Sequence, residues 1–297
     1  MDLTSSMTLQ QYHEKALKEG WAIGHFNVSN LEQIRAIVEA AATLKCPVLI
    51  GTSEGERKYI GPRQAAVVVK SLRQETGLPV FINADHSKSV ESAKAAVDAG
   101  YDSIHIDLSA LPYEENLKGT KEVVEYAKSK VYSDIGEIHV EGELGLLLGE
   151  SKIQKEVIEV NPEQFTKPEE AHEFVEKTGI DRLAPAVGNI HGIPANVKTI
   201  DIELIKTIRK HMASKTGLTL HGASGISDDQ IIGAIKAGVN NIHINTEIRV
   251  AYVNALKKSL EENPEETTPY KLYSSVIAAV RHKVEEKLRL FGSINRV

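Results

Sequence analysis

Eight short apolar segments, each followed by a longer amphipathic stretch, constrain this chain more than any other feature of its sequence. The apolar segments begin at residues 21, 47, 79, 103, 138, 182, 218 and 241, so successive starts are 23 to 44 residues apart. This spacing is typical of strand–helix units in a parallel sheet. Eight such units predict an α/β fold, a (β/α)8 TIM barrel. We expect a single domain, 1–297, with a long inserted loop at 146–167 and a C-terminal helical extension at 264–297.

The composition argues against several classes of partner. Of the 297 residues, 41% are hydrophobic and 26% are charged, and 35 Lys and Arg against 41 Asp and Glu give a net charge of −6. Neither a nucleic acid nor a membrane is therefore an expected partner. Cys46, the single cysteine, is expected to have a buried apolar role. A polar N-terminus and the lack of any run of 18 apolar residues predict a cytoplasmic protein.

Polar residues alternate with apolar residues along several predicted strands. Ile104 and Ile106 alternate with His105 and Asp107, and the same pattern recurs near 138–143 and 241–245. One face of each strand would pack on helices, and the other would face the barrel interior. Burying an unpaired charge there costs on the order of several kcal/mol, because the charge loses its hydration. The interior polar groups must be satisfied by a metal, by one another or by water.

Position along the strand separates two kinds of polar residue. His105, His139 and Glu141 lie early in their strands, where a structural network is the expected role. TIM-barrel sites are built at the carboxyl ends of strands, and the candidates there are Asp85, His86, Asp107, Glu143, His191 and His221. Three imidazoles from separate strands can surround one Zn²⁺ and leave a position open for substrate. A simpler alternative is that Asp85 or Ser87 caps the helix that begins near Ser89.

Two glycine-rich turns follow the sixth and seventh predicted strands. GNIHG, 188–192, and HGASG, 221–225, let the backbone approach a ligand closely and offer N–H groups to an anion. HGASG and the following NTE, 245–247, occupy the region where TIM barrels commonly bind phosphate. Ordinary strand-to-helix turn chemistry is the alternative interpretation.

In their order along the chain, these motifs resemble the class II, metal-dependent fructose-bisphosphate aldolases and their tagatose-bisphosphate relatives. The likeness covers nearly the whole chain, through the segments GHFNVSNLE, TSEG, ADHSKS, HIDLSALPYEEN, VEGELG, AVGNIHG, LHGASG, INTE and FGSINR. The resemblance implies a lyase that cleaves fructose 1,6-bisphosphate into dihydroxyacetone phosphate and glyceraldehyde 3-phosphate through a metal-stabilised enediolate. It also implies a homodimer or homotetramer. Tagatose 1,6-bisphosphate is an alternative substrate.

By the same resemblance, His86, His191 and His221 would bind Zn²⁺, and Asp107 with Glu143 would form a second cation site. Asp85 would be the proton donor, next to His86 but separated from it by a bend of the chain. Glu150, in the loop LLLGESK, lies near the family's catalytic-loop glutamate. The expected substrate contacts are Ser53, Gly192, Gly222, Ala223, Ser224, His243, Asn245 and Thr246.

The chain departs from the family pattern at several of these places. His243 stands where the family typically has asparagine, and Pro194-Ala195 replace a Tyr-Lys pair that helps to hold phosphate. Leu108 and Ala110 replace a small residue and a histidine after the fourth strand. Phosphate would then depend on backbone N–H groups and another cation.

Other classes of protein fit less well. A Schiff-base aldolase needs a lysine at a strand end, and none of the eight predicted strands ends in one. Metal-dependent amidohydrolases often have a His-x-His pair on the first strand, where this chain has only His25. A catalytically impaired barrel that binds a sugar phosphate remains an alternative.

Overall fold

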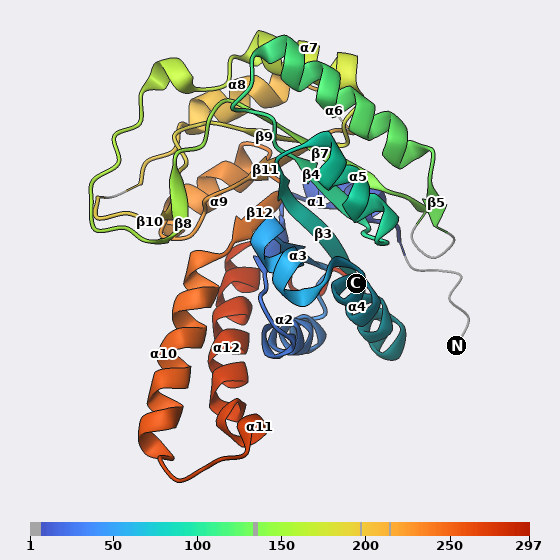
Figure 1. Cartoon of the computed structure of the whole chain (residues 1–297). Coiled ribbons are helices and arrows are strands. Elements are labelled where there is room, and N and C mark those ends of the chain that lie inside the picture. Colours follow the sequence, from blue (N-terminus) through green and yellow to red (C-terminus); the bar gives the residue numbers. More distant parts are fainter. Residues whose placement is uncertain (1–6, 133–135, 197, 214) are drawn as a thin grey trace.

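The computed structural model describes residues 7–132, 136–196, 198–213 and 215–297. Its centre is a closed barrel of eight parallel strands, in the order β1-β12-β11-β9-β7-β4-β3-β2 (Figure 1). The predicted (β/α)8 barrel is confirmed, and each predicted segment contains one barrel strand. These strands are β1 (Ile23–Asn27), β2 (Val48–Thr52), β3 (Val80–Ser87), β4 (Ser103–Ile106), β7 (His139–Leu144), β9 (Arg182–Pro185), β11 (Gly217–Leu220) and β12 (Asn241–Ile244).

Helices follow the strands and cover the outside of the barrel (Figure 1). Their amphipathic faces pack against Val, Ile and Leu side chains from the outer faces of the strands, forming the main hydrophobic core. The covering helices are α2 (Leu31–Leu44), α3 (Glu54–Ile60), α4 (Pro62–Thr76), α5 (Val90–Asp98), α6 (Tyr113–Lys128), α7 (Pro168–Thr178), α8 (Ile202–His211) and α9 (Asp228–Lys236).

Helix α1 (Leu9–Glu19) closes the amino end of the barrel. Its Leu9 and Tyr12 join Ile23, Leu49 and Phe81, from the first three barrel strands, in a second apolar cluster. Thr8 and Gln11 form a capping box that fixes the start of α1. Apolar side chains therefore cover part of this end, where the buried polar pair His13 and Arg182 also lies.

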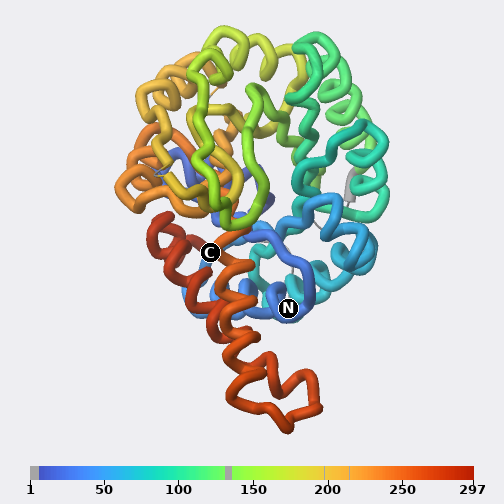
Figure 2. Tube along the Cα trace, turned by 60° about the vertical axis from the view of Figure 1, so that its left-hand side comes forward, coloured from blue at the N-terminus to red at the C-terminus, as the bar shows by residue number. Residues whose placement is uncertain are grey.

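Three helices follow the last barrel strand and form a projecting arm. The arm consists of α10 (Thr246–Glu262), α11 (Pro269–Leu272) and α12 (Ser274–Leu290), as Figures 1 and 2 show. Val276, Val280, Val284 and Leu288 are the buried positions of α12, spaced four residues apart to form one stripe. The expected C-terminal helical extension is confirmed, and α12 returns the chain to the barrel, where Phe291 is buried.

The segment 146–167, expected as a loop, contains regular structure. Its strand β8 (Gly149–Ile153) pairs in parallel with β10 (His191–Ile193), and Pro162–Gln164 form a short 3-10 helix, η1. A second small sheet pairs β5 (Val131–Tyr132) with β6 (Gly136–Glu137). The exposed sequence GESKI has no apolar alternation, and its partner lies about 40 residues further on, so no local pattern indicated β8.

Two further observations concern the single cysteine and the ability of the helices to cross a membrane. Cys46 is buried and free, as expected. In the part of the chain that the structure describes, no helix combines the length and apolar character needed to cross a bilayer.

Candidate active site

The predicted site residues converge at the carboxyl end of the barrel. A cavity of about 310 Å³ opens there. It is bordered by both proposed catalytic residues, by the three predicted zinc ligands and by every predicted substrate contact except Ala223. Ala223 is buried in the apolar core. The predicted second-cation residues Asp107 and Glu143 are buried but do not border the cavity.

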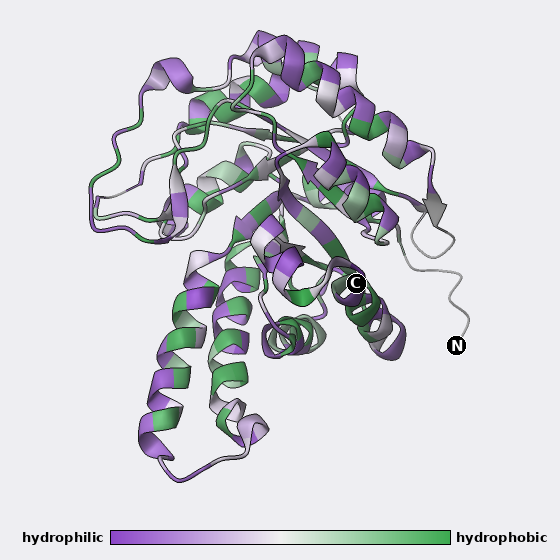
Figure 3. Cartoon of the chain, in the orientation of Figure 1, coloured by the Kyte–Doolittle hydropathy of each residue, from purple (hydrophilic) through white to green (hydrophobic). Residues whose placement is uncertain are grey.

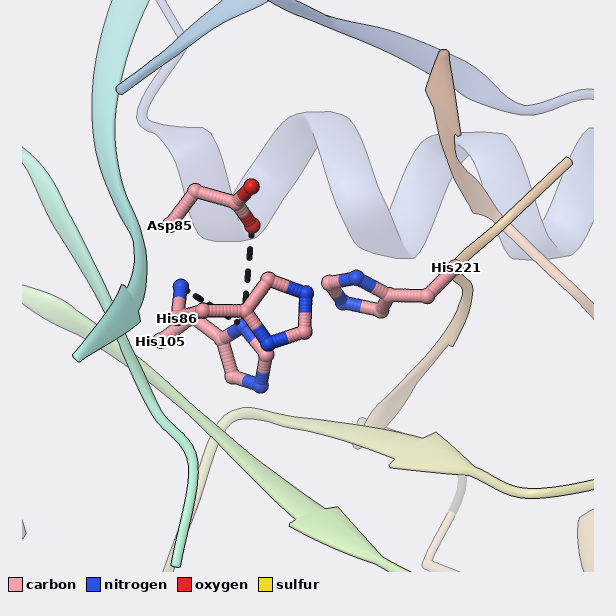
Figure 4. A group of neighbouring side chains, drawn as sticks. All are labelled: Asp85, His86, His105 and His221. Carbon is pink, nitrogen blue, oxygen red and sulfur yellow. Dashed lines mark hydrogen bonds and ion pairs between the residues drawn. The ribbon is translucent and has the colours of Figure 1, made fainter. Parts of the chain in front are cut away.

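A bulge at the end of β3 brings Asp85 and His86 to the same place. Ala84 pairs with Ile104, but Ser87 pairs with Ile106, so β3 has one residue more than β4 over this stretch. His86 takes the left-handed conformation, with φ of 45°, which costs a non-glycine residue about 1 to 3 kcal/mol. Figure 4 shows both side chains turned toward the same group of imidazoles. This is the chain bend that the adjacent pair required.

Buried contacts hold this bulge. Arg57, on α3, donates from Nη1 to the carbonyl of Asp85 at 3.1 Å and from Nη2 to the hydroxyl of Ser87 at 3.1 Å. Neither Asp85 nor Ser87 caps the next helix. Ser89 does, accepting the N–H of Ser92 at 3.1 Å, which removes the simpler reading of the Asp85–His86 pair.

The three predicted zinc ligands lie close together. The ring centroid of His86 is 4.8 Å from those of His191 and His221, and the latter two are 6.3 Å apart. Imidazoles that each bond one Zn²⁺ at about 2.1 Å have ring centres roughly 5 Å apart. The Nε2 atoms of His86 and His191 are 3.1 Å apart. The spacing of His86 from each of the other two rings therefore suits a shared ion. The ligand atoms of His86 and His221 lie within 4.8 Å of one another and of those of Asp85 and His105, and His191 lies outside that group.

Carboxylates fix the far nitrogens of two of these rings. His86 Nδ1 donates to Asp107 Oδ2 at 2.8 Å, and His221 Nε2 donates to Glu141 Oε1 at 2.7 Å. In the neutral rings that a bound metal requires, these bonds would leave His86 Nε2 and His221 Nδ1 as the acceptor nitrogens. Metal-binding histidines almost always have such a partner on the other ring nitrogen. The donor set suits a divalent transition metal.

A second group of possible ligands lies beside the first. Single ligand atoms of His86, Asp107 and Glu143 all lie within 4.8 Å of one another. Burial alone would raise the pKa of the Asp107 carboxyl, but the hydrogen bond from His86 and the charge of His105 hold that pKa well below its usual range. Among the described residues, Glu143 Oε2 is buried without a hydrogen-bond partner. His105 Nε2 lies 3.2 Å from this oxygen, and Asp107 already accepts hydrogen bonds from His86 and Ser109, so a cation here would chiefly serve Glu143.

Asp85 is held as a carboxylate beside the histidines. Asn27 donates from Nδ2 to its Oδ2 at 2.9 Å, and His243 Nδ1 lies 3.3 Å from its Oδ1. Burial favours the neutral form, but the charge of His86 and contacts from His105 and His243 hold the pKa of Asp85 well below its usual range. An ionised carboxylate in this position can accept a proton from a bound hydroxyl.

His243, which departs from the family pattern, is tightly packed. Its ring stacks on that of His25 with centroids 3.5 Å apart and planes 5° apart. Burial lowers the pKa of His243 well below its usual range, so its ring is neutral. Gly51 lies behind His25, where a Cβ would come within 2.0 Å of the imidazole. The stack thus fixes the ring that contacts Asp85.

His105 and Glu141 belong to polar networks, as expected for the barrel interior. His105 is the third of the four residues of β4, so it lies nearer the carboxyl end of the barrel than the sequence predicted. Its Nε2 is 3.2 Å from Glu143 Oε2. Glu141 accepts from Arg182 Nε at 2.8 Å as well as from His221. Arg182 in turn reaches His13 Nε2, at 3.2 Å, on α1. This chain of contacts connects the floor of the barrel to a predicted zinc ligand.

His139 lies away from the candidate site. It borders a different cavity, of about 620 Å³, near the amino ends of β7, β9 and β11. Burial lowers the pKa of His139 to about 3, so its ring is neutral. Its structural role stays a prediction.

Glu150 lies on β8, at the rim of the site. Its side chain is 73% exposed and forms an ion pair with Lys152 at 2.7 Å. The hydrogen bond from Lys152 lowers its pKa. The pairing of β8 with β10 places Glu150 near His191, because Gly149 is the register partner of His191.

The sequence analysis missed three polar residues of this region. Arg249 borders the cavity and donates to the Ser151 carbonyl at 3.0 Å. It follows Asn245 by four residues at the start of α10, and that helical spacing could have indicated it. Asn27 could have been found from its place at the end of β1. Lys198 lies outside any recognised motif, and no sequence signal indicated it.

The sequence and the fold of this chain are similar to those of known proteins. The family model described as "Fructose-bisphosphate aldolase class-II" matches residues 7–296. A fructose-bisphosphate aldolase of Geobacillus stearothermophilus is 37% identical over 294 residues, covering 97% of this chain and 98% of the relative. One of Staphylococcus aureus (strain Mu50) is 36% identical, with 95% of each covered. The crystal structure of the YdjI aldolase from Escherichia coli K12 is similar, with a TM-score of 0.81, 33% identity, and 97% and 98% of the two chains covered.

Proposed function

Because this chain belongs to the class II fructose-bisphosphate aldolase family, we propose that it cleaves fructose 1,6-bisphosphate with a bound zinc ion, releasing dihydroxyacetone phosphate and glyceraldehyde 3-phosphate. It is an enzyme of the class II aldolase type, a lyase. The observation that carries the proposal is the convergence of His86, His191 and His221 beside the Asp85 carboxylate.

His86, His191 and His221 would hold the zinc ion. Their support is the spacing of the three rings and the carboxylate partner on the far nitrogen of His86 and of His221. When bound, the ion supplies a Lewis acid that polarises the substrate carbonyl and stabilises the enediolate charge. Asp107 and Glu143 would hold a second cation or an alternate position of the first.

Asp85 would exchange the proton that cleavage requires. In the cleavage direction its carboxylate accepts the proton of the C4 hydroxyl as the C3–C4 bond breaks and the aldehyde forms. In the condensation direction it returns that proton to the aldehyde oxygen. The contacts from Asn27 and His243 support the role, since they keep the carboxylate oriented.

Glu150 would exchange the second proton, at the enediolate carbon. The residue borders the same cavity as Asp85 and His191. Its exposure and its ion pair with Lys152 mean that it must leave Lys152 to reach the reacting carbon. Movement of an exposed loop over bound substrate is a common way to complete such a site.

The phosphate of the dihydroxyacetone fragment would bind where two backbone segments meet. The N-terminus of the 17-residue helix α10 begins at Thr246 on the cavity wall, next to Gly222 and Ser224. Helix N-termini attract phosphate through unpaired N–H groups and the helix dipole. Arg249, which borders the cavity and is ion-paired with Glu56 at 2.6 Å, would supply the additional cation that the missing Tyr-Lys pair requires. Ser53 and Gly192 border the remaining wall.

We also propose that the protein is a cytoplasmic homodimer or homotetramer that works in glycolysis and gluconeogenesis. The family and the names of its relatives support the metabolic role. The projecting arm supports self-association, because Val253, Leu260 and Tyr270 expose 45%, 50% and 74% of their surfaces.

A cleavage assay with metal analysis tests the proposed function. The purified protein should contain zinc, release aldehyde from fructose 1,6-bisphosphate faster than from tagatose 1,6-bisphosphate, lose activity to a chelator and regain it with added Zn²⁺. A reversed preference would assign the tagatose substrate. Binding of zinc and sugar phosphate without aldehyde release would support the impaired barrel instead.

Substitution of one zinc ligand sharpens the test. His221→Ala should lose both zinc and activity, because its ring is one of three proposed protein ligands. His211→Ala, which alters an exposed histidine on α8, should retain both. Full zinc occupancy in His221→Ala would refute the ligand assignment.

A further inference from the structure

Lys198 is a buried lysine whose ammonium group contacts only backbone carbonyl oxygens among the hydrogen bonds of the described chain. It is 3% exposed. Its Nζ donates to the carbonyl of Ile190 at 2.7 Å and to those of Gly222 and Ser224, each at 2.6 Å. No carboxylate forms an ion pair with Lys198 in the described part of the chain. A lysine rarely occupies such a place unless its charge has a use.

The three carbonyls belong to the two turns that carry zinc ligands. Ile190 directly precedes His191, Gly222 directly follows His221, and Ser224 borders the proposed phosphate site. The turns are in direct contact as well. A Cβ on Gly222, whose φ is +62°, would come within 2.3 Å of the Ile190 carbonyl oxygen. Lys198 is thus the group that joins them.

Electrostatics explains why a cation is needed at this point. Carbonyl oxygens that converge on one centre repel one another unless a positive charge lies between them, and this is how hard metal cations are held. The three N–H bonds of an ammonium match three acceptors one to one, whereas a neutral amine has only two. Burial lowers the pKa of Lys198 to about 7, and the charge of Glu247 opposes that change. The third carbonyl favours the charged form.

Gln230 holds the segment that carries Lys198. Its amide Nε2 donates to the Lys198 carbonyl at 2.9 Å, and its Oε1 accepts the Ile200 N–H at 2.8 Å. The backbone at Lys198 and at Ile200 is therefore hydrogen-bonded to a side chain of α9. Because its backbone is anchored, the Lys198 side chain is pre-organised to place its ammonium group at one fixed point.

We propose that Lys198 is a tethered cation that positions the turns at 190–192 and 222–224, doing for this site what a bound monovalent metal ion would otherwise do. The inference rests on the proposed function in one respect, since it identifies the positioned turns as the phosphate-binding wall. Lys198 is a positioning residue, because its ammonium group is used up on backbone oxygens and does not border the cavity.

The wild-type protein provides the first test. Its activity and its melting temperature should not change when K⁺ or NH4⁺ replaces choline at constant ionic strength. Saturable activation of the wild type by K⁺ would overturn the inference, because a filled site has no room for a second cation.

Variants of Lys198 provide the second test. Lys198→Ala should raise the KM for the sugar phosphate about tenfold or more, as expected when charge-assisted hydrogen bonds are lost, and K⁺ or NH4⁺ should restore it. Lys198→Met, whose side chain fills the same space without charge, should show the same defect and no rescue. Lys206→Ala, an exposed lysine on α8, is the matched control. An unchanged KM in Lys198→Ala, or equal rescue of both variants, would refute the proposal.

A readout without catalysis separates this inference from the proposed function. The melting temperature of Lys198→Ala, and its calorimetric affinity for inorganic phosphate, should rise with K⁺. If wild type cleaves the sugar but Lys198→Ala shows neither defect nor K⁺ response, the inference fails alone. If no cleavage occurs but K⁺ still raises phosphate affinity in Lys198→Ala, the proposed function fails and the positioning role stands.

Discussion

At the scale of single residues, the site depends on backbone conformation as much as on side-chain chemistry. Asp85 and His86 are adjacent, and on a regular strand they would point to opposite faces. The bulge in β3 and the positive φ of His86 turn both toward the cavity. Arg57, on helix α3, stabilises this distortion through hydrogen bonds to the Asp85 carbonyl and the Ser87 hydroxyl. The strain is stored where the proposed metal ligand and proton-transfer group must act together.

The role of Asp85 can be tested without disturbing this geometry. Asp85→Asn keeps the shape of the side chain but cannot accept a proton, so kcat should fall by about 100-fold or more. Zinc content should stay near that of the wild type, because His86, His191 and His221 are unchanged. The measurements are steady-state cleavage and metal analysis on the same sample. Undiminished kcat would assign the proton transfer to another group.

Individual residues were predictable from the sequence where a motif carried them. The three histidines and Asp85 belong to motifs that occur in a recognisable order along the chain, and the structure places them at one cavity. Lys198 and Arg249 were not predictable in this way. Each contacts segments that are distant in sequence, and neither residue type is unusual in a polar segment.

At the scale of elements, Arg182 connects four parts of the fold. Fully buried on β9, it donates to Glu141 on β7 and to the hydroxyl of Ser103 on β4, and it contacts His13 on α1. Glu141 then holds the imidazole of His221. Hence the same ion pair both supports the barrel interior and orients a proposed zinc ligand.

Replacing Arg182 separates these two effects. Arg182→Met should destabilise the protein by about 3 to 5 kcal/mol, because it leaves the Glu141 charge buried without its partner. Zinc affinity should fall by about 10- to 100-fold, the usual cost of disturbing a ligand's support. Urea unfolding and competitive zinc titration measure the two quantities.

The double variant Arg182→Met/Glu141→Leu provides the comparison. It should recover part of the lost stability, since an apolar pair replaces the ion pair, but not the zinc affinity, since His221 would still lack its carboxylate. Recovery of both would show that Glu141 does not orient His221. Loss of neither in Arg182→Met would contradict the network as a whole.

Elements were predictable to the extent that their patterns are local. The eight barrel strands could be recognised because apolar runs and amphipathic helices alternate at regular spacing. Strand β8 could not, because its five residues are mostly exposed and acquire strand structure only by pairing with β10. The return of α12 onto the barrel also depends on partners far away in sequence.

At the scale of the whole molecule, the arm of α10, α11 and α12 extends beyond the barrel (Figure 2). Figure 3 shows hydrophobic colour along both long helices of the arm. Lys287 of α12 pairs with Glu247, in the first turn of α10, at 2.8 Å, and Glu247 accepts the N–H of Gly225 at 2.9 Å. The base of the arm is therefore bonded to the glycine turn beside the proposed phosphate site.

Self-association through the arm is expected to show in solution. Light scattering should give a particle mass that is two or four times the 32.6 kDa mass of one chain. The double substitution Val253→Glu/Leu260→Glu places charges on the exposed apolar surface of α10 and should reduce that multiple. Val67→Glu, at a somewhat more exposed apolar position on α4, should leave it unchanged. A monomeric wild type would exclude the proposed oligomer.

The glycine at position 51 has a consequence beyond its own strand. Gly51 lies behind the His25 ring. That ring stacks on the ring of His243, and His243 contacts the carboxylate of Asp85. Even one methyl group at position 51 would have to displace the His25 ring, and the His243 ring stacked on it would have to adjust. Gly51 therefore helps to set the orientation of the group that we propose moves the proton, through two stacked imidazoles and not by direct contact.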